Sequence, residues 1–210
     1  MASSVPDKLR LLLLAAALPA LSWAQLAGPG LPISLDADSS EFDRKNNVMI
    51  FNQISIRQGD LTISANQARS SNLDFGNAEW VFSGNVLIEG LDTRLRASTA
   101  TLRFVNHDLR SARIAGKPAA FEQERAEFDE PVRGSASVME YDLAAKLIKM
   151  SGSAWLQEGN NEILGEVIAY NIAEQRVIAT SDEAGSQRVQ ITITPDENTR
   201  IEIPKPPVDK

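Results

Sequence analysis

A seven-residue pattern recurs five times along this chain. The copies read ADSSEFD from Ala37, ANQARSS from Ala65, ASTATLR from Ala97, ASVMEYD from Ala136 and GEVIAYN from Gly165. Each copy begins with a small residue, and the starts lie 28, 32, 39 and 29 residues apart. A repeat of this period predicts one supersecondary unit stacked on copies of itself, because a unit of this size cannot bury its own apolar face. We therefore expect an elongated, modular molecule whose long surface suits an elongated ligand.

The units are predicted to be β-hairpins. Apolar and polar residues alternate in residues 54–57, 61–65 and 189–194, whereas no segment has the length and period of an ordinary helix. Polar turn signals follow the seven-residue copies at residues 44–47, 106–108, 143–146 and 172–175, and a second frame recurs as FSGN from Phe82 and MSGS from Met150. Many short strands with regular turns predict an antiparallel all-β sandwich, roll or barrel. A β-solenoid remains open, although the uneven spacing argues against a strict one.

The chain divides into three parts. Residues 1–24 combine Lys8 and Arg10 with a short apolar run and end in Ser-Trp-Ala, which predicts a secretory signal peptide cleaved after Ala24. Residues 25–194 are long enough for one domain, and the Pro-rich residues 195–210 are expected to be mostly disordered. The charged stretch 122–133 is predicted to be a loop or a long hairpin tip.

Composition narrows the function. The chain carries a net charge of −7 and shows no basic run, so we expect no nucleic-acid partner. It contains no cysteine, which excludes disulfides and thiolate metal sites. An anionic ligand would have to be held mainly through its apolar part.

Little in the sequence supports catalysis. The single histidine, His107, falls in a predicted turn without a nucleophile motif around it. Asp36, Asp38, Glu41 and Asp43 alternate near the start and could bind a hard cation, but a solvated edge strand is the better interpretation. We expect no enzyme, no metal and no cofactor. A carbohydrate-active enzyme is the alternative from another class, and it would require two facing carboxylates in a sugar-sized cleft.

Several segments, taken together behind a signal peptide, resemble the LptA/OstA-like family of lipopolysaccharide-transport proteins. They occur in the family's order and cover most of residues 32–181: PISLDAD from Pro32, FSGNVLI from Phe82, GKPAAF from Gly116, RGSASVMEYDL from Arg133, LIKMSGSAWLQ from Leu147 and GEVIAY from Gly165. A further block at Phe51 to Gly59 suggests about one additional unit, residues 48–78. The resemblance implies a twisted, V-shaped antiparallel β-jellyroll built from repeated hairpin units.

The resemblance also implies a function. Such a protein would act in the periplasm and bind lipopolysaccharide, through its lipid A, in an apolar groove, carrying it from the inner to the outer membrane. Ile33, Phe121, Tyr141 and Leu143 fall in matching segments and would line that groove, although each could equally be an ordinary core residue. Lys117 and Arg133 also lie in matching segments; they could meet lipid phosphates, but solvation at the surface is the better interpretation.

The implied partners are jellyroll domains at the two membranes and further copies of this chain, stacked head to tail. The edges for stacking would be the strands near residues 33–37 and 189–194. The alternative is an envelope scaffold with the same fold that makes protein contacts only and binds no lipid.

Overall fold

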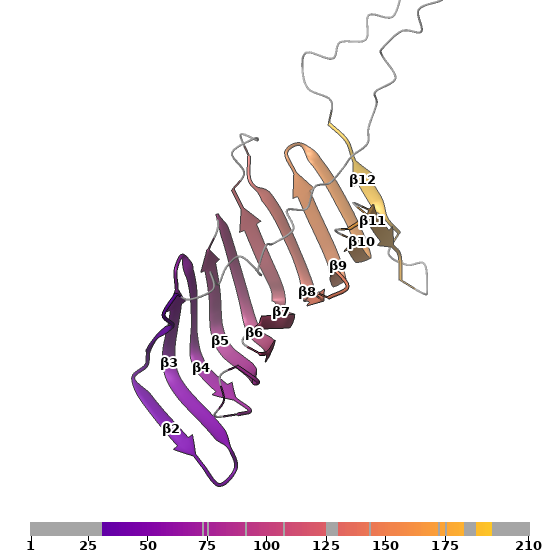
Figure 1. Cartoon of the computed structure of the whole chain (residues 1–210). Coiled ribbons are helices and arrows are strands. Elements are labelled where there is room, and N and C mark those ends of the chain that lie inside the picture. The colour runs from indigo at the N-terminus through magenta and orange to yellow at the C-terminus, as the bar shows by residue number, and fades with distance from the viewer. Residues whose placement is uncertain are drawn as a thin grey trace, which may run out of the picture.

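The structure, a computed structural model, describes residues 31–194 except residues 73, 75, 91, 107, 125–129, 143, 172, 175 and 183–187. The described residues form one antiparallel sheet of twelve strands and no helix, so they include no helical segment able to cross a membrane (Figure 1). The strands are β1 (Ser34–Asp36), β2 (Ser39–Asp43), β3 (Val48–Gln58), β4 (Leu61–Ser70), β5 (Glu79–Gly90), β6 (Thr93–Val105), β7 (Asp108–Gln123), β8 (Val132–Asp142), β9 (Leu147–Glu158), β10 (Asn161–Asn171), β11 (Arg176–Thr180) and β12 (Gln190–Thr192). The expected all-β antiparallel fold is confirmed.

Sequence order and spatial order agree. Strands β3 to β10 lie side by side in chain order, as four successive hairpins that form the long body of the sheet (Figure 1). Both ends are built alike: β1 and β2 share the edge of β3, and β12 and β11 share the edge of β10. The segments predicted as the two edges, residues 33–37 and 189–194, therefore contain the edge strands β1 and β12.

Each long strand is interrupted near its middle. The pairing register shifts where β4 meets β5, β5 meets β6, β6 meets β7, β7 meets β8, β8 meets β9 and β9 meets β10. On β3, Gln53 adopts a left-handed conformation with φ of 51° at the corresponding place. Bulges bend a strand and increase its twist, so a line of them across neighbouring strands bends the whole sheet. This line, which we call the bend, divides the sheet into two halves.

The seven-residue repeat marks the bend. Its first residue is Ala65 in β4, Ala97 in β6, Ala136 in β8 and Gly165 in β10, next to the register shift in each of these strands. Ala37 lies between β1 and β2, at the same level on the edge. A small residue therefore stands at each of these points.

Glycine is required where neighbouring strands meet at the bend. Gly84 and Gly152 have φ of 75° and 80°, in the left-handed region that side chains disfavour. A Cβ atom on Gly84 would lie 2.7 Å from Nδ2 of Asn66, and one on Gly152 would lie 2.7 Å from Oγ of Ser137. Asn66 and Ser137 are the second residues of their seven-residue copies. The seven-residue repeat and the FSGN and MSGS frames therefore supply the two partners of the same contact between neighbouring strands.

In three copies of the repeat, the last residue caps the following turn. Asp43 Oδ1 accepts hydrogen bonds from the backbone N–H groups of Lys45 and Asn46, each at 3.0 Å. Asp142 Oδ1 accepts one from Ala145, and Asn171 Oδ1 accepts two from the turn after β10. Short polar side chains favour turns for this reason. The turns predicted in these places are confirmed as far as the structure describes them.

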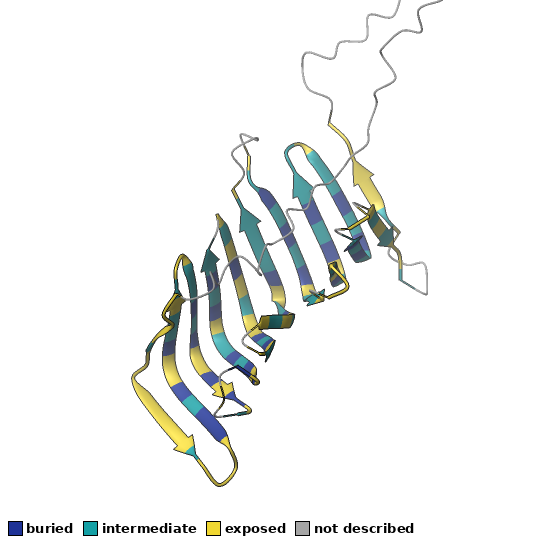
Figure 2. Ribbon diagram, viewed as in Figure 1, coloured by how far each residue is buried: buried dark blue, intermediate teal, exposed yellow. Residues whose placement is uncertain are grey.

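Burial shows that the two halves of the sheet cover one another. The buried apolar side chains form one cluster. Figure 2 shows buried residues along both halves of the long strands. Within the described residues, only the opposite half of the same strands is available to cover them. Phe82 and Ile168, both 1% exposed, lie beside the bend at the centre of this cluster.

The structure describes some of the segments predicted from the sequence and not others. The loop predicted over residues 122–133 is shorter, since β7 continues to Gln123 and β8 begins at Val132. The predicted signal peptide at 1–24 and the tail at 195–210 lie outside the described residues. The additional unit predicted at 48–78 contains the β3–β4 hairpin, which is the first of the four hairpins.

Candidate functional site

A continuous row of apolar side chains crosses the inner face of the sheet. It lies in the half that contains the β3–β4, β5–β6, β7–β8 and β9–β10 turns, which we call the tip half. Each member is the cross-strand partner of the next, from β1 to β12. This tip row consists of Leu35, Ile56, Ile63, Ile88, Leu95, Phe121, Gly134, Leu156, Ile163 and Ile191. No charged or polar side chain interrupts it over ten strands.

The other half, which we call the Asx half after its Asn and Asp turn caps, carries a facing row from β2 to β11. Its members are Phe42, Met49, Ser70, Trp80, Leu102, Ala112, Tyr141, Ile148, Tyr170 and Val177. Aromatic rings gather at its N-terminal end, where Trp80 stacks on Phe51 and Phe82 with centroids 5.9 Å and 6.0 Å away. The inner face therefore offers apolar surface on both halves along the length of the molecule.

Burial varies among the apolar side chains of the inner face. Ile54, Val86 and Met150 are 2% exposed and lie next to the bend. Phe121, Tyr141 and Ile148 lie farther out, are only partly buried, and pack against the core. A lipid could contact partly buried apolar side chains such as these without unfolding the protein.

The Phe121 ring packs over Gly134 on the neighbouring strand. It pairs with Leu95 on one side and Gly134 on the other. A Cβ atom on Gly134 would lie 2.3 Å from Cε1 of the Phe121 ring, so the ring occupies the space that any larger residue at 134 would need. The ring thus continues the tip row across β8, where Gly134 itself contributes no side chain.

Tyr141 lies in the Asx half, between Ala112 and Ile148. Burial raises the pKa of its phenol above the ordinary value, because the phenolate would lose hydration. Tyr141 is therefore neutral at physiological pH and combines an apolar ring with a polar hydroxyl. Phe121 and Tyr141 belong to opposite halves of the same inner face.

The other two predicted lining residues are Ile33 and Leu143. Ile33 precedes β1 at the N-terminal end, with 54% of its surface exposed, and four strands lie between β1 and β7, the strand of Phe121. Leu143 lies outside the described residues. That any of the four lines a lipid site stays a prediction.

The structure adds residues that the sequence reasoning missed. Ile88, Leu95, Leu156 and Ile163 are tip-row neighbours of Phe121 along the sheet. These residues could have been assigned to the inner face from the sequence by aligning the strands at the first residue of each seven-residue copy. Side chains alternate along a strand, so such an alignment assigns each side chain to one face of the sheet.

The described residues contain no cluster of three or more possible metal ligands. Asp36 pairs with Arg57 at 3.2 Å on the exposed edge, and Arg133 pairs with Glu122 at 3.0 Å. Lys117 is exposed on β7. His107 lies outside the described residues.

The fold and its apolar inner face define a class of protein, an elongated open β-sheet folded around an apolar interior. Residues 67–176, just over half of the chain, match the family model described as LptA/(LptD N-terminal domain) LPS transport protein. The chain belongs to this family.

Known relatives extend the match. The chain is 28% identical over 197 residues to the lipopolysaccharide export system protein LptA of Escherichia coli K12, covering 91% of this chain and 88% of the relative. It is 26% identical over 136 residues to LptH of Pseudomonas aeruginosa, covering 61% of this chain and 77% of the relative. The crystal structure of LptH, described as a periplasmic component of lipopolysaccharide transport, matches with 23% identity and a TM-score of 0.49 over 79% of this chain and 96% of that one.

Proposed function

We propose that this protein is a periplasmic lipopolysaccharide-binding bridge that carries lipopolysaccharide from the inner to the outer membrane. The observation that carries the proposal is the uninterrupted tip row, which extends from one edge of the sheet to the other. Family membership supports it, since the related proteins are named for lipopolysaccharide export. The predicted signal peptide, cleaved after Ala24, would deliver the chain to the periplasm.

Burial of acyl chains supplies the binding energy in this proposal. Each methylene transferred from water to an apolar surface contributes about 0.8 kcal/mol. The tip row and its facing row provide apolar surface for several chains at once, so strong contacts to lipid phosphates are not needed. This agrees with the acidic character of the protein. The proposal assigns no catalytic step and no cofactor.

The edges of the sheet are proposed to join the protein to neighbours. Strands β1 and β2 form one edge and β11 and β12 the other, so each presents backbone groups that a further strand can pair with. The exposed large hydrophobic residues of the described chain also gather near these ends: Leu31, Ile33, Phe42, Ile178, Ile191 and Ile193. Joining unlike edges extends the stack without closing a ring. Copies of this chain and jellyroll domains at the two membranes are the proposed neighbours.

Binding of lipopolysaccharide to purified protein lacking residues 1–24 tests the central step. Saturable binding is expected, and Phe121→Asp or Tyr141→Asp should weaken it more than either substitution lowers stability, because a carboxylate on the inner face opposes acyl chains. Ala120→Asp is the matched control, since Ala120 neighbours Phe121 on the opposite face. No binding with intact β-type circular dichroism would favour a scaffold. Unfolding of both inner variants would make Phe121 and Tyr141 core residues.

Analytical ultracentrifugation tests the stacking. We expect oligomers whose average size increases with concentration and whose formation is lost on deleting residues 187–210. A single monomeric species over a wide concentration range, or oligomers unchanged by the deletion, would contradict end-to-end stacking.

A further inference from the structure

A rung of residues, polar except for Val132, borders the tip row. Thr93 pairs with Gln123, Gln123 with Val132, and Glu158 with Asn161, at the outer ends of β6 to β10. Phe121 and Ile163 point into the core, and side chains alternate along a strand, so Gln123 and Asn161 point to the same inner face. The rung therefore lies at the rim of the inner face, one step beyond Phe121 and Ile163.

Two side chains of this rung are unusual in their hydrogen bonding. Oε1 of Gln123 and Oδ1 of Asn161 are buried from solvent and accept no hydrogen bond. They are the only such side-chain atoms found in the described part of the chain. Buried polar atoms nearly always have partners, so an exception calls for an explanation. Both exceptions occur on one rung of one rim.

The chemistry of the rung restricts what can satisfy these atoms. The two amide oxygens can only accept hydrogen bonds. The nearest cations in the register, Arg94 and Arg133, pair with Glu89 and Glu122, and both project to the outer face. The rung thus favours groups that donate hydrogen bonds over phosphates.

We propose that Gln123 and Asn161 bind the polar part of an amphiphile, accepting hydrogen bonds from its sugar hydroxyl or amide N–H groups while its acyl chains lie on the tip row. This inference rests on the proposed function and refines it. It places the head group at the rim of the tip half and the chains toward the bend. The unpaired oxygens are then part of a site that is completed by its ligand.

Apolar replacements of similar size test the assignment. The variants are Gln123→Met, Asn161→Leu and the double variant, and Gln157→Met on the outer face of β9 is the control. Binding is measured with lipopolysaccharide and with palmitate, which has an acyl chain but no hydrogen-bond donor when ionised. Thermal unfolding of each variant without ligand is the second measurement.

We expect the double variant to bind lipopolysaccharide about tenfold more weakly, as two hydrogen bonds are lost, and to bind palmitate as the wild type does. The unfolding midpoint should not decrease, since removing an unsatisfied buried oxygen does not destabilise the fold. Unchanged lipopolysaccharide affinity would overturn the inference, as would an equal loss for palmitate or a loss in the Gln157→Met control. If the wild type binds palmitate but not lipopolysaccharide, or binds neither, the proposed function fails first and this inference fails with it.

Discussion

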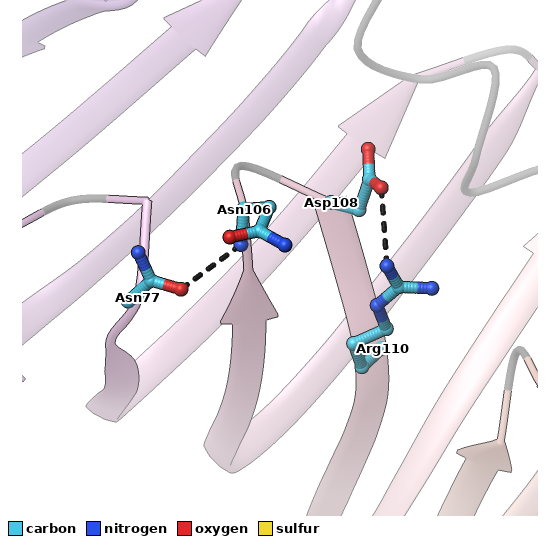
Figure 3. A network of polar contacts seen from close by, with 4 residues as sticks. All are labelled: Asn77, Asn106, Asp108 and Arg110. Carbon is cyan, nitrogen blue, oxygen red and sulfur yellow. Dashed lines mark hydrogen bonds and ion pairs between the residues drawn. The ribbon is translucent and has the colours of Figure 1, made fainter.

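The two long rims of the sheet, at the outer ends of the Asx half and the tip half, differ in how their polar side chains are hydrogen-bonded. At the Asx rim, in the turns from β4 to β5 and from β6 to β7, polar side chains bond to one another and to the turns. Asn77 Oδ1 accepts from the backbone N–H of Asn106 at 3.0 Å, and Asp108 pairs with Arg110 at 3.3 Å (Figure 3). At the tip rim, Gln123 and Asn161 keep buried oxygens without partners.

This difference indicates that one rim stabilises the fold and the other is available to a ligand. A rim whose hydrogen bonds are made internally stabilises the fold and offers little to a ligand. A rim that leaves buried acceptors unused gives up some stability, and such sites in natural proteins are often functional. We therefore expect that replacing polar residues reduces the stability of the fold at the Asx rim and reduces lipopolysaccharide binding at the tip rim.

The largest effect is expected for Asn72→Ala at the Asx rim. Asn72 Oδ1 accepts from Asn47 and from the backbone of Asp74, and its Nδ2 donates to the Asn77 carbonyl. Losing three hydrogen bonds should lower the free energy of unfolding by about 1–3 kcal/mol, measured by denaturant titration. Asn160→Ala, an exposed turn residue at the tip rim, is the control and should change stability by less than about 0.5 kcal/mol. Equal losses of stability for Asn72→Ala and Asn160→Ala would contradict the difference between the two rims.

A smaller effect is expected on the outer face of the tip half. Arg94 bonds to Glu89 at 2.8 Å and stands opposite Glu122, which in turn pairs with Arg133. Arg94→Gln should cost about 0.5–1 kcal/mol, and the cost should shrink in roughly 1 M salt because these side chains are exposed. Arg96→Gln, whose neighbours are Leu87 and Ala120, should cost less. A cost that does not depend on salt would point to packing rather than charge.

The smallest effect concerns Asp43 and pH. Hydrogen bonds from the Asn46 side chain and from backbone N–H groups hold the pKa of Asp43 below its ordinary value of 3.8. Its contribution to stability is therefore complete above 3.8 and is lost as the pH falls through the lowered value. The stability difference between the wild type and Asp43→Asn should disappear over this range. An NMR titration of the Asp43 carboxyl with a midpoint at or above 3.8 would show that the turn cap does not favour the ionised form.

Much of the architecture could be predicted from local patterns. Alternation predicted the strands, and Asp43, Asp142 and Asn171 marked turns because short polar side chains bond to the backbone next to them. The repeat predicted stacked units, but its physical meaning, a small residue at a bend and a cap at a turn, required the pairing register. The bend at Gln53 has no comparable signal, since neither glycine nor the repeat marks it.

The candidate site could be predicted only in part. Phe121 and Tyr141 were found through a family resemblance, and the structure places both on the inner face. The full tip row depends on which residues pair across strands, information that no single strand contains. Gln123 and Asn161 could not be recognised, because an unsatisfied acceptor is a property of tertiary burial and not of residue type.

The central claim is that acyl chains lie on the inner face, and adjacent residues on opposite faces test it most directly. Ile88 and Ile163 belong to the tip row, whereas their neighbours Leu87 and Leu164 point outward. NMR of methyl-labelled protein with bound lipopolysaccharide should show cross-peaks from acyl methylenes to the methyls of Ile88 and Ile163 and none to those of Leu87 and Leu164. Cross-peaks to the outer pair, or to both pairs equally, would contradict the claim.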